Sequence, residues 1–304
     1  MNIRDLRYTA ALAEHRHFGR AAQACFVGQP TLSAQIRKLE QELGVTLFER
    51  TRRSVRITPV GEEVVALART LLATADLIVE TAKASLDPLS GPLRLGMIPT
   101  IGPYLTPTLL PSLRYGLPNV IFDLSEDTTE TLERQLLDGQ IDAAIIATEI
   151  ADPHLSEIML FEEPFWIALP SNHVLADRDE VALQDIAAEE LLLLEDGHCL
   201  RDQVISFCTE AFGLDPRVNT YHTSLMTIIA LVGSGAGVTL VPALSLGGSW
   251  VTDSGIAMRK ETSRQAHRAV RVVFRSSFPR RPLLEKLADI VCAGVPDTVS
   301  PVRR

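Results

Sequence analysis

Two cysteines nine positions apart, Cys199 and Cys208, are the residues with the most reactive chemistry in the sequence. Cys199 follows an apolar, strand-like run at 191–194 and opens a segment that we predict to be a helix. A thiol at a helix N-terminus, close to His198 and Arg201, has its thiolate favoured by the helix dipole and by positive charge. The thiolate is the form that peroxide oxidises to sulfenic acid, with which a second thiol condenses to a disulfide. Cys208 is the candidate for that second thiol.

The spacing of the two cysteines predicts that a disulfide between them requires a change of fold. In one continuous helix their Cα atoms lie ~13.5 Å apart and on opposite sides, whereas a disulfide brings Cα atoms to ~5.5 Å. Oxidation would therefore unravel this segment and bias a two-state element. The alternative is that both side chains are buried apolar fillers, as free cysteines most often are. The spacing alone does not decide between the two.

The remaining cysteines favour neither a secreted disulfide framework nor a metal site. Cys25 and Cys292 are predicted to be packing residues, because four scattered cysteines are too few for such a framework. No Cys-x-x-Cys pair is present. His198, Cys199 and Cys208 stand at i, i+1 and i+10, which does not match a common zinc site. We expect no metal and no cofactor.

The net charge of −9 conceals two oppositely charged parts. Residues 1–60 hold ten Lys and Arg against five Asp and Glu, whereas the rest of the chain holds 19 bases against 33 acids. A basic head on an acidic body indicates that the head meets a polyanion. With 304 residues, 46% of them apolar, the chain is long enough for two domains and is not disordered. Charged residues throughout the first twenty positions argue against a signal peptide, so we expect a cytoplasmic protein.

One interval, residues 218–252, contains no charged side chain and has to be weighed as a membrane span. Glycines within 233–237 and Pro242 interrupt it before ~20 apolar residues can accumulate. The interval therefore predicts a buried helix of about a dozen residues, a turn and a short strand at 238–241.

The basic head has the apolar spacing of three short helices, at residues 3–15, 19–25 and 30–43. In the third helix the inward-facing positions are expected to be Leu32, Ile36, Leu39 and Leu43. Two helices joined by a tight turn, the second with polar and basic side chains outside, are typical of a helix-turn-helix that reads the major groove. The alternative is a small helical domain with a solvated basic face.

The β-prone, basic residues 48–58 that follow are predicted to form a wing whose arginines touch phosphates. Together with the third helix they give the candidate DNA contacts, which are Gln29, Pro30, Thr31, Ser33, Gln35, Arg37, Lys38, Arg50, Arg52, Arg53 and Arg56.

Residues 59–86 predict one helix of ~28 residues, or ~42 Å, because apolar side chains recur every three or four positions. Two of its faces are apolar. Such a length exceeds that of an ordinary element within a domain, so we expect an exposed coiled-coil linker and hence a dimer. The run Asp87-Pro-Leu-Ser-Gly-Pro92 ends the helix.

Beyond residue 92 strands and helices alternate, which predicts a parallel α/β sheet. The body is large enough for two lobes with a cleft between them, and we expect the chain to cross between the lobes near 163–164 and 267–269. The expected strands are residues 93–98, 120–124, 143–147, 166–169, 191–194, 238–241 and 270–274.

The head carries a motif that resembles the LysR-type transcriptional regulators. It reads Phe18-x-x-Ala21-Ala22, then Gln29-Pro-Thr-Leu-Ser33-x-Gln35-Ile36-x-x-Leu39-Glu40-x-x-Leu43-Gly44-x-x-Leu47-Phe48-x-Arg50-Thr51. Gly28 departs from the family, which commonly has Ser there, and weakens the helix cap by about a few tenths of a kcal/mol.

A second set of motifs resembles more specifically the subgroup of that family that senses hydrogen peroxide. It comprises Met1-Asn-Ile-Arg-Asp-Leu6, Ala11-Leu-Ala-Glu-His-Arg-His-Phe18, Ser90-Gly-Pro-Leu93, Ile98-Pro-Thr100, Gly102-Pro-Tyr-Leu105 and Leu194-Glu-Asp-Gly-His-Cys-Leu-Arg-Asp-Gln203 with Cys208.

The resemblance implies a homotetrameric activator of antioxidant genes, with a mainly α winged helix-turn-helix head and an α/β, two-lobed, periplasmic-binding-protein-like regulatory domain. It implies that peroxide oxidises Cys199, that Cys208 resolves it in a reversible disulfide, and that a glutaredoxin- or thioredoxin-type reductant resets the pair. Double-stranded DNA and RNA polymerase would be its partners. The expected divisions are 1–58 for the head, 59–90 for the linker helix and hinge, and 91–304 for the regulatory domain, with lobe I about 91–163 and 269–304 and lobe II about 164–268.

The resemblance also supplies the other members of a peroxide pocket. Thr100 and Thr129, which follow expected strands, resemble hydroxyls that hold peroxide beside the sulfur, although unaided each would be interpreted as a helix cap. His198 and Asp202 match by their place around the cysteine. A family arginine best fits Arg268, with Arg264 and Arg271 left as alternatives.

Two other functions compete with this one. A LysR-type regulator could respond to a small effector in the cleft, with the cysteines incidental, and it would keep its response when Cys199 is replaced by Ser. A thiol peroxidase could turn peroxide over, but it needs neither the basic head nor the long helix. We expect a regulator and not an enzyme.

Overall fold

The computed structural model of the chain describes residues 1–50, 55–84, 87–211, 213, 217–247, 255–263 and 266–302. Its contacts divide it into two units, which we describe one at a time. The first is Met1–Leu86 with Leu137–Gln140, and the second is Asp87–Leu136 with Ile141–Arg304. Within the described ranges, no helix is both long and apolar enough to cross a membrane.

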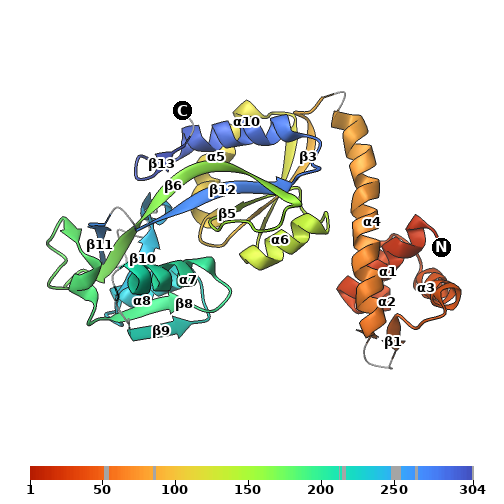
Figure 1. Cartoon of the computed structure of the whole chain (residues 1–304), viewed down its shortest axis with the longest axis horizontal. Helices are drawn as coiled ribbons and strands as arrows, with labels where there is room; N and C mark the ends of the chain where they lie inside the picture. The colour runs from red at the N-terminus through yellow and green to blue at the C-terminus, as the bar shows by residue number, and fades with distance from the viewer. Residues whose placement is uncertain are drawn as a thin grey trace. The chain divides into compact units, whose positions relative to one another are not determined.

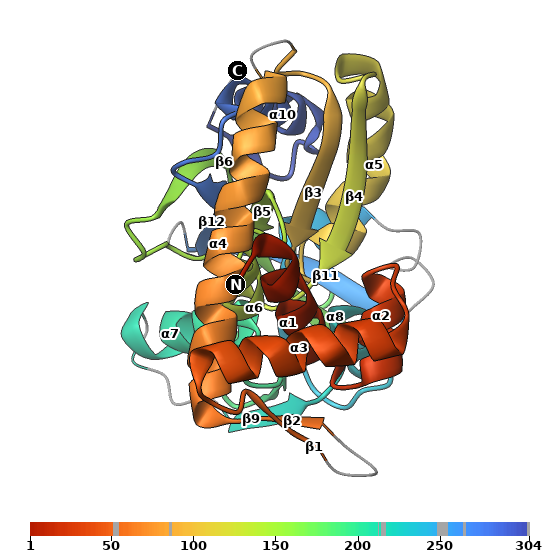
Figure 2. The same ribbon diagram turned by 90° about the vertical axis from the view of Figure 1, so that its right-hand side faces the viewer.

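The head contains the three predicted helices and the wing (Figure 2). Its elements are α1 (Ile3–His15), α2 (Phe18–Ala24), α3 (Gln29–Leu43), β1 (Phe48–Arg50) and β2 (Val55–Ile57). The helix starts are fixed locally: Asn2 and Asp5 form a capping box at α1, and the His17 ring accepts from the first backbone N–H groups of α2. β1 and β2 pair in antiparallel register.

Helix α3 holds the head together through its inner face. Leu32, Ile36 and Leu39 are buried in the head core, as predicted. The prediction is wrong for Leu43, which is 39% exposed because it is the last residue before α3 ends at Gly44. Gly44 has a φ of 71°, a left-handed conformation that glycine adopts without strain.

The predicted long helix is α4 (Pro59–Ala84), whose 26 residues extend about 39 Å. Val65 and Ala68 are buried on one side of α4. Leu67, Leu71 and Ile78 leave a second apolar face exposed. The last two residues of the predicted helix, 85 and 86, lie outside the described residues.

The second unit is built on one large sheet and a separate strand pair. The strands of the sheet are β3 (Gly91–Met97), β4 (Val120–Glu126), β5 (Ala143–Ile146), β6 (Leu155–Pro170), β7 (Glu180–Val181), β10 (Thr239–Pro242), β11 (Ile256–Glu261), β12 (His267–Arg275) and β13 (Ser300–Pro301), and the separate pair is β8 (Glu190–Leu194) with β9 (Arg217–Tyr221). The helices are α5 (Gly102–Gly116), α6 (Thr129–Leu137), α7 (Cys199–Ser206), α8 (Leu225–Gly233) and α10 (Arg281–Gly294), and a π-helical turn, η2 (Phe207–Ala211), continues α7.

The sheet is mixed, which corrects the predicted parallel sheet. Its main path in the described residues runs β4-β3-β5-β12-β6-β11-β7, and β3 is parallel to both β4 and β5. β12, however, is antiparallel to β5 and to β6. The reason is that β6 carries the chain out to the second lobe and β12 brings it back along the same line, so the two strands must run in opposite directions.

β6 and β12 lie side by side (Figure 1). Both strands contribute to the first of two hydrophobic cores, and β6 continues into the second. Most of the first core comes from residues 93–161 and 270–299, and the second core comes from residues 165–241 with Ala266. In register, Glu163 faces Arg268 and Pro164 faces His267, at the two points where the sequence predicts the crossings. The predicted helix and strand within 218–252 are α8 and β10. β10 is buried throughout, whereas α8 has nine residues and buries only one face, because Met226, Thr227 and Ala230 are exposed.

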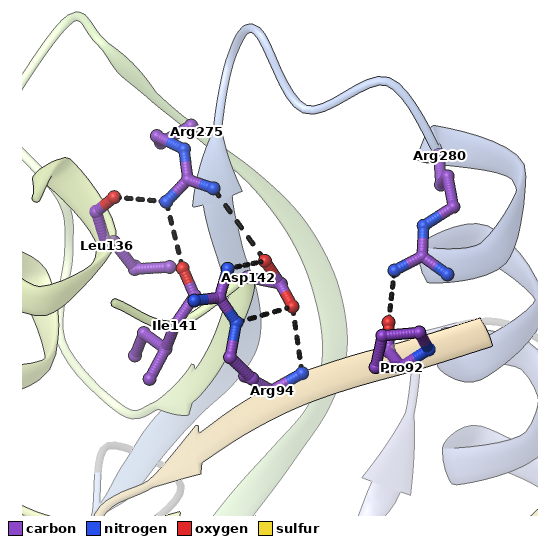
Figure 3. Close-up of polar contacts among 7 residues, drawn as sticks. All are labelled: Pro92, Arg94, Leu136, Ile141, Asp142, Arg275 and Arg280. Carbon is purple, nitrogen blue, oxygen red and sulfur yellow. Dashed lines mark hydrogen bonds and ion pairs between the residues drawn. The ribbon is translucent and has the colours of Figure 1, made fainter. Parts of the chain in front are cut away.

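A polar cluster fixes the first strand of this unit (Figure 3). Asp142 accepts from the Arg94 backbone N–H at 2.9 Å and from its guanidinium at 2.7 and 3.2 Å. Arg275 donates to the carbonyls of Leu136 and Ile141. Arg280 donates to the carbonyls of Ser90 and Pro92, so the start of β3 is tied to the segment that leads into α10.

Candidate functional site

Cys199 is the first residue of α7, directly after the loop that leaves β8. Gly197 has a φ of 94° in this loop, and His198 is the N-cap residue. Leu200 and Val204 bury the inner face of α7 in the second core, whereas Cys199 itself packs against the first core. The sulfur therefore lies where the two cores approach each other.

A small cavity lies beside Cys199. It has a volume of about 10 Å³ and is lined by Ile98, Pro99, Thr100, Thr128, Thr129, Gly197, His198 and Cys199. These residues come from the loop after β3, the start of α6 and the loop before α7. A cavity of this size encloses about one water molecule. Cys199 itself is half-buried, so part of it remains accessible from outside the cavity.

Thr100 and Arg268 are held together on the wall of this site. Arg268 is almost completely buried, and its guanidinium donates to the Thr100 hydroxyl at 2.9 Å and to the Thr100 carbonyl at 3.1 Å. Its Nε donates to Glu163 at 2.8 Å, and Glu163 is itself fully buried. Of the two candidate arginines that the structure describes, Arg268 is the one whose charge acts on the Cys199 sulfur.

The two alternatives to Arg268 have different places. Arg271 is paired with Glu157 at 2.8 Å, farther along the same two strands. Arg264 lies outside the described residues.

Thr129 is the first residue of α6 and lines the cavity. Its buried hydroxyl makes no hydrogen bond of good geometry within the described structure. The Thr129 hydroxyl nevertheless lies close enough to the Cys199 sulfur to act as a donor to it, which favours the thiolate form of the cysteine. A donor without a better partner is therefore available to a ligand or to the sulfur.

Burial dominates the electrostatics of Cys199. Burial raises the pKa of the thiol, and the Arg268 charge, the Thr129 hydroxyl and the Leu200 N–H oppose this increase. The predicted source of positive charge needs correction. Burial lowers the pKa of His198, which favours its neutral form, and Arg201 is engaged elsewhere.

Asp202 and Arg201 are not among the residues that line the cavity. Arg201 bridges Asp196 at 2.8 Å and Asp202 at 3.0 Å, and the Asp202 carboxylate is largely exposed. The remaining effect of Asp202 on Cys199 is to raise the thiol pKa. The structure thus brings Thr100, Thr129, His198, Cys199 and Arg268 together and leaves Asp202 at the rim.

Cys208 lies in η2, at the far end of the helical segment that Cys199 begins. It is buried in the second core, and burial raises the pKa of its thiol to about 11. All four cysteines are free. Nine helical steps separate the two Cα atoms by ~13 Å, so the segment cannot hold a disulfide in this form.

The packing predictions for the other two cysteines agree with the structure in part. Cys292 is buried in α10, and its thiol donates to the Leu160 carbonyl at 3.1 Å. Cys25 ends α2 and is half-buried. Among the residues that the structure describes, no three His, Cys, Asp or Glu side chains could hold a metal ion.

The head presents the predicted DNA contacts from α3 and the wing. Gln29, Pro30, Thr31, Arg37 and Lys38 are exposed, and Ser33 and Gln35 are half-buried. Arg37 folds back to donate to the Ser33 carbonyl and hydroxyl at 3.3 and 3.2 Å. Arg56 is exposed on β2, and Arg50 lies in β1 with only its backbone described. Arg52 and Arg53 lie outside the described residues.

Sequence reasoning missed three residues around the site. Glu163 is a buried partner of Arg268, Gln203 donates to the Ala147 carbonyl at 2.6 Å, and Tyr104 packs against both cores. Burial raises the pKa of Tyr104 to about 12. Gln203 and Tyr104 belong to the motifs that resemble the peroxide-sensing subgroup. No signal in the sequence distinguishes Glu163 from the carboxylates around it that lie on the surface.

Comparisons with known proteins identify two family models. The model described as "Bacterial regulatory helix-turn-helix protein, lysR family" matches residues 3–62. The model described as "LysR substrate binding domain" matches residues 87–294. Among curated proteins, the "Hydrogen peroxide-inducible genes activator" of Pectobacterium carotovorum is 45% identical over 96% of both chains. The "DNA-binding transcriptional dual regulator OxyR" of Escherichia coli is 44% identical over 96% of this chain and 95% of its own. A solved full-length OxyR variant from Pseudomonas aeruginosa is 39% identical with a TM-score of 0.80, covering 96% of this chain and 94% of its own.

Proposed function

The chain belongs to the LysR family of bacterial transcriptional regulators, and we propose that it is a DNA-binding activator that senses hydrogen peroxide through Cys199. The observation that carries the proposal is the cavity of about 10 Å³ beside this sulfur. It suits an oxidant little larger than water, and it is far smaller than the roughly 300–1,000 Å³ typical of pockets that enclose an organic effector. Relatives named for induction by peroxide support the same signal.

The chemistry that we propose has two steps. The Cys199 thiolate attacks one peroxide oxygen, the O–O bond breaks, and the products are a sulfenic acid and hydroxide, which takes up a proton as water. The Cys208 thiol then gives up its proton and its sulfur attacks the sulfenic sulfur, so that the S–S bond forms, the S–O bond breaks, and the leaving hydroxide takes up that proton as a second water. Thr100, Thr129, His198 and Arg268 would orient the peroxide, and Asp202 would act only from the rim.

The second step couples oxidation to shape. Because α7 and η2 keep the two Cα atoms ~13 Å apart, the disulfide requires this segment to unwind. Leu200 and Val204 anchor α7 in the second core, so unwinding disturbs that core as well. A thiol reductant of the glutaredoxin or thioredoxin type would return the pair to the free state.

In our proposal the head binds DNA and α4 joins two chains, so these two parts carry the response to transcription. Helix α3 enters the major groove, the wing arginines touch phosphates, and the exposed apolar face of α4 pairs two chains. Two such dimers form the tetramer that rearranges on the promoter and engages RNA polymerase in the cytoplasm. The working division of the chain remains 1–58, 59–90 and 91–304, with lobe II about 164–268.

The test compares Cys199→Ser, Cys208→Ser and Cys25→Ser in transcription from a peroxide-inducible promoter with purified RNA polymerase. Peroxide is expected to activate the wild type and Cys25→Ser and to leave Cys199→Ser silent, while mass spectrometry finds a sulfenic acid without a disulfide in Cys208→Ser. Retained activation of Cys199→Ser would instead support a regulator with a small effector. Sustained peroxide turnover with thioredoxin, at enzyme-like rates, would support a thiol peroxidase.

A further inference from the structure

Glu163 occupies a position that the chemistry above does not use. It lies on β6 where the strand passes from the first core to the second, and its side chain is fully buried. Both of its carboxylate oxygens are occupied: Oε1 accepts from the Leu244 backbone N–H at 2.7 Å, and Oε2 accepts from Arg268 Nε at 2.8 Å. A buried carboxylate with two donors is a fixed point from which a neighbour can be positioned.

Arg268 connects this fixed point to the thiol site. Its Nε faces Glu163, and its two terminal nitrogens donate to the hydroxyl and carbonyl of Thr100, which lines the cavity beside Cys199. The guanidinium is thus held from two sides, and its orientation is determined by β6 as much as by its own strand. Burial raises the pKa of Glu163, and the Arg268 charge and the two hydrogen bonds that the carboxylate accepts oppose this increase. In its ionised form Glu163 partly balances the Arg268 charge, so less of that charge acts on the sulfur.

We propose that Glu163 is a positioning residue for Cys199: it fixes the Arg268 guanidinium against Thr100 and limits how strongly that positive charge favours the Cys199 thiolate. This rests on the proposed function only in assigning Cys199 as the sensing thiol. Among the residues that the structure describes, the other charged or titratable groups near the sulfur are His198 and Asp202, and Tyr104 lies close to Arg268.

Three variants distinguish this role from simple stabilisation of the fold. Glu163→Gln removes the negative charge but keeps a side-chain oxygen that can accept from Arg268 Nε, so the guanidinium stays positioned against Thr100. The double variant Glu163→Gln with Arg268→Gln removes both charges and avoids an unpaired buried ion. Glu157→Gln is the matched control, because Glu157 pairs with Arg271 at 2.8 Å between the same two strands.

The experiment measures the rate of iodoacetamide alkylation of Cys199, by mass spectrometry of its peptide, as a function of pH in the full chain. Glu163→Gln is expected to lower the pKa of Cys199 by about one unit, because the Arg268 charge is no longer balanced. The double variant is expected to have a pKa above that of the wild type, and Glu157→Gln is expected to match the wild type.

The order of the pKa values decides the question. An unchanged pKa in folded Glu163→Gln, or the same shift in Glu157→Gln, would overturn the proposal. If Glu163→Gln does not fold, the double variant decides alone, because a pKa at or below the wild-type value would show that Arg268 does not act on this sulfur. The readout contains no peroxide and no DNA, so its failure is separate from a failure of the proposed function.

Discussion

The two ends of the α7–η2 segment hold the same side chain in different surroundings. Burial raises the pKa of both thiols. At Cys199 the Arg268 charge, the Thr129 hydroxyl and the Leu200 N–H oppose that increase. At Cys208 the shift comes from burial, which raises the pKa of the thiol to about 11. The comparison teaches that the groups facing each sulfur, more than its place on the helix, separate a reactive thiol from an inert one.

This difference also orders the events that we propose. Cys199 borders a cavity and can meet peroxide in the folded state. Cys208 is buried in the second core and cannot act as a nucleophile until the segment opens. Cys199 is therefore oxidised before the α7–η2 segment unwinds. The packing around Cys208 in the second core slows the unwinding that must follow before the disulfide can form.

The largest expected effect is a difference in alkylation between the two thiols. In the reduced, folded protein at pH 8, iodoacetamide should modify Cys199 on the order of 1,000-fold faster than Cys208, because Cys208 is buried and almost entirely protonated. Peptide-resolved mass spectrometry measures both rates in one sample. In urea the two rates should converge, and comparable rates in the native protein would remove the basis of the comparison.

A second prediction concerns stability at high pH. The pKa of Cys208 is about 11 in the folded chain against 9.0 for an unperturbed thiol, so between these values the folded state binds a proton that the unfolded state has lost. The contribution is fully present below pH 9 and is lost as the pH rises toward 11, by about 3 kcal/mol. Urea unfolding of wild type and Cys208→Ala at pH 8, 9, 10 and 11 measures it.

The control for that measurement is built into the pair of proteins. Cys208→Ala lowers stability by a constant packing amount at every pH, whereas the thiol contribution makes the wild type approach the variant as the pH rises. Tyr104, whose pKa is about 12, titrates in both proteins and cancels. Parallel stability curves from pH 8 to 11 would contradict a buried, protonated Cys208.

The sequence predicted the elements around the thiols better than the charges that act on them. The start of α7 at Cys199 followed from an apolar strand, a glycine and a run of helix-forming residues, all of them local signals. The exposed strand β9 carried no alternating apolar pattern and was missed, as were β11 and most of β6. Short-range patterns identify an element only where one of its faces is buried regularly.

The site residues divide in the same way. Thr100, Thr129 and His198 followed from resemblance, and the structure brings them to one cavity with Cys199. The sequence neighbours of the sulfur suggested Arg201 as its cation, but the effective charge comes from Arg268, 69 positions away in the chain. Arg268 lies on β12, whose pairing with β6 brings it to Glu163, and it is hydrogen-bonded to Thr100 beside the cavity; no local pattern encodes this long-range arrangement.

The smallest expected effect isolates one of the three groups that distinguish Cys199. Thr129→Val keeps the shape of the side chain and removes the hydroxyl, so the Cys199 thiolate loses a donor and alkylation at pH 8 should slow by about threefold to tenfold. The free energy of unfolding should stay constant or rise, because this buried hydroxyl makes no hydrogen bond of good geometry in the described structure. Thr131→Val, two residues farther along the same helix, is the control: it removes a hydroxyl that is bonded to Thr128 at 3.0 Å and does not line the cavity, and it should leave the rate unchanged. A Thr129→Val protein that is less stable and alkylated at the wild-type rate would mean that the hydroxyl serves the start of α6 and not the sulfur, and the contrast between the two thiols would then rest on Arg268 and the Leu200 N–H.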